Sequence, residues 1–126
     1  MLFEIESAKD LAAIGQGLQE AAARHGFGVI AVHDLKEAME KKGVTFDGEC
    51  MIFEVCNPQQ AKKVLEANGA VSTVLPCRIS VYRGPLGFRI AAVLPTALMK
   101  IFASPSLLPV AREVEQVIVA MMKEAA

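Results

Sequence analysis

Apolar and polar residues alternate along the chain with two different periods, and each change of period marks the edge of a predicted element. A period of two residues predicts five strands, over residues 2–6, 27–33, 49–55, 77–83 and 88–94. A helical period predicts helices that begin after Ser7, Asp34, Asn57, Pro95 and Ser106. The predicted order is therefore β-α-β-α-β-α-β-β-α-α.

Residue types that cap helices support these boundaries. Ser7, with Asp10 three places later, is typical of a capping box at the start of the first helix, and Gly26 is expected to end that helix. Asn57 is a preferred N-cap residue. Pro58 follows it at the first helical position, where the missing N–H would have no helical partner in any case.

A hairpin indicates the type of sheet. Residues 84–87, Gly-Pro-Leu-Gly, form a turn between the last two strands, which predicts that these strands pair antiparallel. We therefore predict an α+β fold with a mainly antiparallel five-stranded sheet rather than a doubly wound parallel one. Met51, Phe53 and Val55 are expected on one face of the sheet. Long helices are expected to cover one face, and short helices or a second subunit the other.

Charge and composition narrow the classes of protein. The 126 residues fit one domain, and 13 basic side chains nearly balance 14 acidic ones, for a net charge of -1. Binding to nucleic acid or to an anionic membrane normally needs a basic patch, so neither partner is expected. No stretch approaches the roughly 20 apolar residues of a membrane-spanning helix, and residues 1–6 lack the basic start of a secretory signal. A cytoplasmic protein is expected.

The apolar content is high for so short a chain. Hydrophobic residues make up 53% of the sequence, and the mean hydropathy is +0.38. This excess predicts that some apolar surface is buried against a partner rather than exposed to water. Self-association is the expected arrangement.

Most sequence signatures of catalysis are missing. The chain has no glycine-rich dinucleotide or phosphate loop, no Gly-x-Ser-x-Gly elbow and no His-Glu-x-x-His motif. Two cysteine segments remain. Cys56-Asn57-Pro58 places a thiol before a helix N-terminus, whose N–H groups and dipole favour a thiolate or a bound anion. Residues 75–77, Leu-Pro-Cys, place Cys77 at the start of a strand, so the two thiols converge if their strands are neighbours.

The same residues also have simpler interpretations. Unpaired cysteines are often small buried apolar residues, and Cys56 and Cys77 fit that role as well. Together with His33 they give only three metal ligands, so no metal and no cofactor is predicted. His33 beside Asp34 is a candidate base at a strand end, although Asp34 is also predicted to cap a helix. Arg83 is a candidate ligand for an anion.

These segments together resemble a known family. The segments that carry the resemblance are 26–34, Cys56-Asn57-Pro58, Leu75-Pro76-Cys77, the strand with Val81-Tyr82, and Pro95. In this order they resemble the domain of unknown function 302 family over nearly the whole chain. The resemblance implies a fold similar to that of the TATA-binding protein, with a curved antiparallel sheet packed by a long helix, in a homodimer. It implies neither DNA binding nor an activity.

Three functions stay open at this point. The first is a module that binds a small molecule or an anion, with Cys56, Asn57, Cys77 and Arg83 as contact residues. The second is a thiol-dependent redox enzyme or transferase that uses Cys56 and Cys77, with His33 as a further catalytic candidate. The third is a purely structural dimer.

Overall fold

The computed structural model describes residues 1–126 as five strands, five α-helices and one 3-10 helix. The strands are β1 (Leu2–Ser7), β2 (Gly28–Asp34), β3 (Cys50–Cys56), β4 (Cys77–Gly84) and β5 (Gly87–Val93). The helices are α1 (Leu11–Arg24), α2 (Leu35–Glu40), α3 (Pro58–Ala67), η1 (Gly69–Val74), α4 (Pro95–Met99) and α5 (Leu107–Ala125). The predicted order is confirmed, and the short 3-10 helix η1 is an addition to it.

All five strands form one antiparallel sheet in the order β1-β5-β4-β3-β2. The hairpin between β4 and β5 pairs Gly84 with Gly87, so only two residues form its loop instead of the predicted four. In the next pair of strands, Val55 of β3 lies opposite Cys77 of β4. The prediction of an α+β fold with a mainly antiparallel five-stranded sheet is confirmed.

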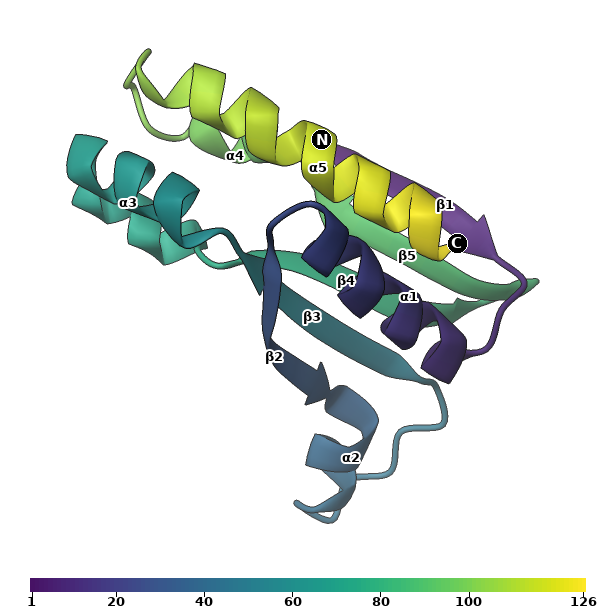
Figure 1. Cartoon of the computed structure of the whole chain (residues 1–126). Coiled ribbons are helices and arrows are strands. Elements are labelled where there is room, and N and C mark those ends of the chain that lie inside the picture. The colour runs from purple at the N-terminus through teal and green to yellow at the C-terminus, as the bar shows by residue number, and fades with distance from the viewer.

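The main core lies between this sheet and two helices. Figure 1 shows α1 and α5 side by side over one face of the sheet. The glycine at position 17 permits their close approach, because a Cβ atom there would lie 3.2 Å from the Cα of Ala125. The large fully buried side chains of this core are Ile14, Leu18, Val55, Ile79, Val81, Ile90, Ile118, Met121 and Met122.

The second face of the sheet has no such helical layer. Of the short helices, α4 packs on α5 and η1 packs on α3, whereas α2 contacts β2 and β3 at one edge of the sheet. Neither α4 nor η1 therefore covers this face, and cover by a second subunit stays a prediction. Ion pairs cross this face, between Arg89 and both Glu4 and Glu6, and between Arg78 and Glu54.

The first helix begins later than the capping-box pattern predicts. Asp10 is the N-cap residue of α1, and its carboxylate accepts a hydrogen bond from the Ala13 N–H at 2.8 Å. Ser7 is the last residue of β1, and its hydroxyl donates to the Ala126 carbonyl oxygen at 3.0 Å. The serine thus ties the strand to the end of α5 rather than starting a helix.

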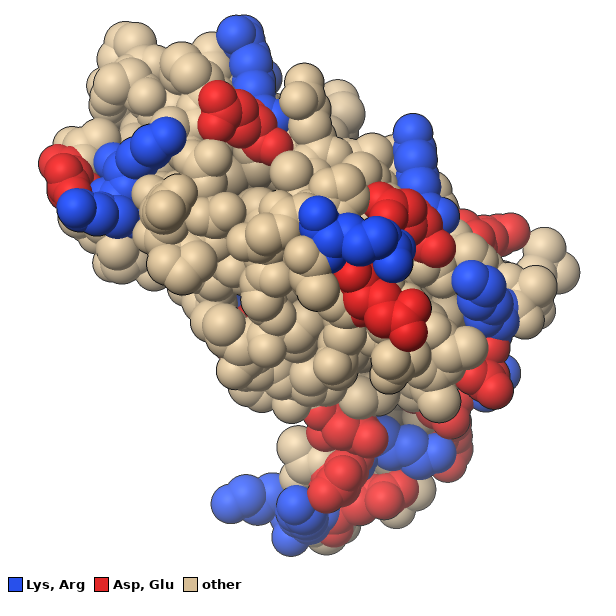
Figure 2. Space-filling view, viewed as in Figure 1, with Lys and Arg blue, Asp and Glu red and all other residues tan.

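A second, smaller apolar cluster lies beyond the end of the sheet, between α3, η1, α4 and α5. Its buried members are Val64, Val71, Met99, Leu107 and Ala111. Figure 2 shows a broad area of this face without charged side chains, while charges gather over α1, the C-terminal end of α5 and α2. None of the helices combines the length and the apolar character needed to cross a membrane.

Candidate functional site

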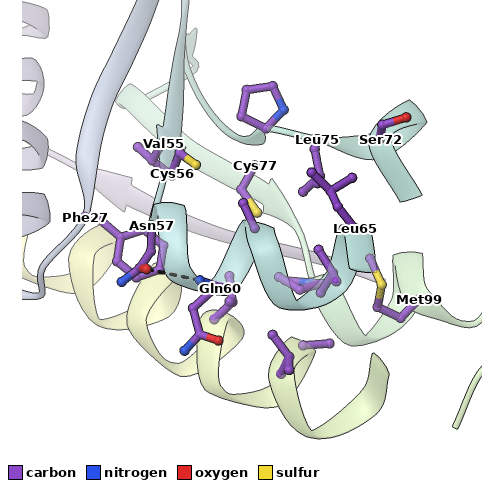
Figure 3. Close-up of a pocket in the computed structure, with 17 residues that line it drawn as sticks. Phe27, Val55, Cys56, Asn57, Gln60, Leu65, Ser72, Leu75, Cys77 and Met99 are labelled. Carbon is purple, nitrogen blue, oxygen red and sulfur yellow. Dashed lines mark hydrogen bonds between the residues drawn. The ribbon is translucent and has the colours of Figure 1, made fainter. Parts of the chain in front are cut away.

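A pocket of about 280 Å³ lies where the two apolar clusters meet. Its wall consists of 17 residues, 12 of them hydrophobic, and none is a lysine, arginine, aspartate or glutamate. Phe27 and Val55 come from the main core, while Val64, Met99 and Ala111 come from the second cluster. Figure 3 shows that α3 and α5 enclose the pocket together with the ends of β3 and β4.

Asn57 fixes the start of α3 beside this pocket. Its Oδ1 accepts hydrogen bonds from the N–H groups of Gln59 at 3.0 Å and Gln60 at 3.2 Å, which confirms the predicted N-cap. Its Nδ2 donates to the Gly26 carbonyl oxygen at 3.3 Å and so ties α3 to the chain before β2. The next N–H group, of Ala61, donates to the Asn57 carbonyl oxygen. An anion at this helix start would have to displace the Asn57 side chain.

Cys77 forms part of the apolar wall. As the first residue of β4 it lies opposite Val55, on the face of the sheet that the helices cover. Burial, and to a smaller extent the negative charge of an ionised Cys56 nearby, raise the pKa of its thiol from 9.0 to about 11. The thiol of Cys77 is therefore neutral near pH 7.

Cys56 ends β3 and lines the same pocket. The structure thus brings together Cys56, Asn57 and Cys77, three of the residues that sequence reasoning selected (Figure 3). Pro76 also lines the pocket, and its peptide bond with Leu75 is cis. No disulfide joins the cysteines.

The two other candidate residues lie away from this pocket. Arg83 is near the far end of β4, where its guanidinium pairs with Glu49 and lies over the ring of Phe88, 4.7 Å from the centroid. His33 is on β2, with its Nε2 3.4 Å from an oxygen of Glu54. No group of three or more histidine, cysteine or acidic side chains is placed to hold a metal ion.

Sequence reasoning missed the part of the pocket that α4 and α5 supply. Its wall there consists of Pro95, Met99, Val110, Ala111 and Val114. The two valines belong to the apolar stripe that predicts packing of α5 against the rest of the protein. A stripe of this kind has the same pattern whether it meets a packed core or an open pocket, so the sequence holds no signal that separates the two.

Comparisons with known proteins agree with this fold. The family described as "Domain of unknown function DUF302" matches residues 3–125. The crystal structure of the uncharacterized conserved protein DUF302 from Bacillus stearothermophilus is similar to this chain, with a TM-score of 0.93 and 29% sequence identity. The similarity covers 99% of this chain and 98% of that one, so it includes the elements that enclose the pocket. No curated protein matches the chain.

Proposed function

The chain belongs to the DUF302 family, whose description gives no activity, and we propose from its pocket that it binds a small molecule with an apolar body between α3 and α5. The observation that carries the proposal is the hydrophobic lining of this pocket, 12 residues of 17. Binding would remove both the ligand and this lining from water, which is the usual driving force in small-molecule sites.

The fold gives a physical reason to expect an occupant. Protein interiors are normally packed as densely as organic crystals, and voids larger than a water molecule are few. The side chains around this pocket come from two buried clusters, yet they leave about 280 Å³ open. Water gains little in an apolar space because it finds few hydrogen-bond partners there. An apolar ligand would restore the missing contacts.

The cysteines support binding more than thiol chemistry. A nucleophilic or redox-active cysteine reacts as the thiolate. Burial holds the pKa of Cys77 at about 11, so its thiolate is rare at neutral pH. A neutral thiol behaves as a small apolar group, which suits the wall of a pocket for an apolar molecule.

Titration with 1-decanol, followed by two-dimensional NMR of the backbone amides, tests this proposal. We expect saturable shifts in α3 and in the first half of α5. Ala61→Phe should abolish them, because Ala61 lines the pocket and the ring would fill it. Ala67→Phe is the matched control, since Ala67 lies on the same helix but is exposed and does not line the pocket. Equal binding by both variants, or no saturable shift in the unmodified protein, would contradict the proposal.

A further inference from the structure

A second hollow of about 280 Å³ adjoins the pocket between α3 and α5. The two share four lining residues, which are Leu75, Pro76, Cys77 and Pro95. These residues border both hollows, with the first hollow on the side of α3 and the second reaching towards Arg78. A molecule that fills the first hollow would therefore have the second as its neighbour.

The second hollow differs from the first in one chemical respect. Arg78 lines it, and no other charged side chain lines either hollow. The Nε of Arg78 lies 3.6 Å from an oxygen of Glu54, and the guanidinium donates no hydrogen bond within the protein. Its side chain is 65% exposed, so a molecule from solvent can reach it.

We propose that the two hollows form one binding site for an apolar monocarboxylic acid. The inference rests on the proposed function and adds to it the polar end of the ligand. The apolar body occupies the hollow between α3 and α5, and the carboxylate binds Arg78 in the neighbouring hollow. A guanidinium suits this role because its planar fork of N–H donors matches the two oxygens of a carboxylate.

Two other places that could bind the carboxylate of the ligand are less suitable. The N–H groups at the start of α3 already donate to Asn57. Arg83 lies near the other end of β4 and is held by Glu49 through both its Nε and a terminal nitrogen. Arg78 combines a guanidinium that donates no hydrogen bond within the protein with a position beside the apolar space.

Glu54 limits how much Arg78 can strengthen the binding of a carboxylate. Its carboxylate carries a charge of the same sign as the ligand and already interacts with the guanidinium. The site is also open to water, and exposed ion pairs are weak. We therefore expect Arg78 to strengthen carboxylate binding by about 2- to 5-fold at low ionic strength, and the gain to disappear in high salt.

The test compares decanoate with 1-decanol, which have chains of equal length and different head groups. Dissociation constants are measured by NMR titration for the unmodified protein, for Arg78→Gln and for the matched control Arg83→Gln. Comparing the ratio of the two constants between the variants and the unmodified protein cancels the intrinsic difference between the head groups. Arg78→Gln should shift this ratio against decanoate by about 2- to 5-fold, and Arg83→Gln should leave it unchanged.

The outcomes separate this inference from the proposed function. If both probes bind in the α3–α5 pocket and Arg78→Gln leaves the ratio unchanged, the carboxylate assignment is wrong and the apolar site stands. If neither probe gives a saturable shift, both proposals fail. A ratio that is already insensitive to salt between 20 mM and 500 mM in the unmodified protein also overturns the carboxylate assignment, without any substitution.

Discussion

Replacing Asn57 by alanine tests how the site is built. The substitution removes the Oδ1 that accepts from the N–H groups of Gln59 and Gln60, and the Nδ2 that donates to the Gly26 carbonyl oxygen. Pro58 has no N–H and cannot take over the cap. The first turn of α3 would lose its side-chain cap and its link to the start of β2.

The lost helix cap and the lost hydrogen bond to Gly26 lower the free energy of unfolding by different amounts. Loss of a helix N-cap costs about 1 kcal/mol, with a usual range of about 0.5–2 kcal/mol. The bond to the Gly26 carbonyl oxygen is exposed and 3.3 Å long, so we assign it about 0.5 kcal/mol, the lower end for a hydrogen bond. The expected loss for Asn57→Ala is therefore about 1–2 kcal/mol in the free energy of unfolding.

Urea denaturation followed by circular dichroism measures this loss, and a second variant divides it. Asn57→Asp keeps an oxygen for the cap but removes the amide that donates to Gly26, so it should lose only about 0.5 kcal/mol. A loss below about 0.3 kcal/mol for Asn57→Ala would refute the reasoning, because it lies under the range for any true cap.

Three further predictions concern the cysteines and the assembly. Cys56 lines the open pocket beside the start of α3, so it should react with iodoacetamide before Cys50 and Cys77. Mass spectrometry of labelled peptides measures this order. Equal, slow labelling of all three cysteines would contradict the prediction. Folding keeps the Cys77 thiol protonated up to a pKa of about 11, whereas an unfolded chain loses that proton near 9.0, so stability should fall as pH rises from 9 to 11. The free energy of unfolding should fall by at most about 2 kcal/mol, and this fall should be absent in Cys77→Ala. Urea denaturation across this pH range measures it. The same fall in the variant would show that other groups cause it. We also predict a homodimer, and light scattering that shows a stable monomer at micromolar concentration would contradict it.

The sequence predicts most of the fold because its capping and turn residues mark the same element boundaries as its apolar periodicity. Asn57 followed by Pro58 marks the start of α3, and the glycines of segment 84–87 mark the hairpin. Both signals depend on residues close together in the chain, where cap and turn chemistry decide the structure. The start of α1 differs from the predicted one because Ser7 has a distant partner, the carbonyl of Ala126, which no local pattern indicates.

The sequence predicts only part of the candidate site, because local patterns do not indicate contacts between distant segments of the chain. The strand-to-helix passage at Cys56 and the start of β4 at Cys77 are local features, and the antiparallel pairing of β3 with β4 brings them to one pocket. The opposite wall comes from α5, more than 50 residues further along the chain than Cys56. Arg78 stands out only once the second hollow is known, because its sequence context is that of an ordinary hairpin arginine.

The central claim is that the pocket between α3 and α5 holds the apolar body of a ligand. A crystal structure of the protein grown with 1-decanol tests it most directly. The account predicts density for the alkyl chain against Val64, Cys77 and Val110, with the fold otherwise unchanged. A structure with this pocket empty and the chain bound elsewhere, for example on the uncovered face of the sheet, would contradict it.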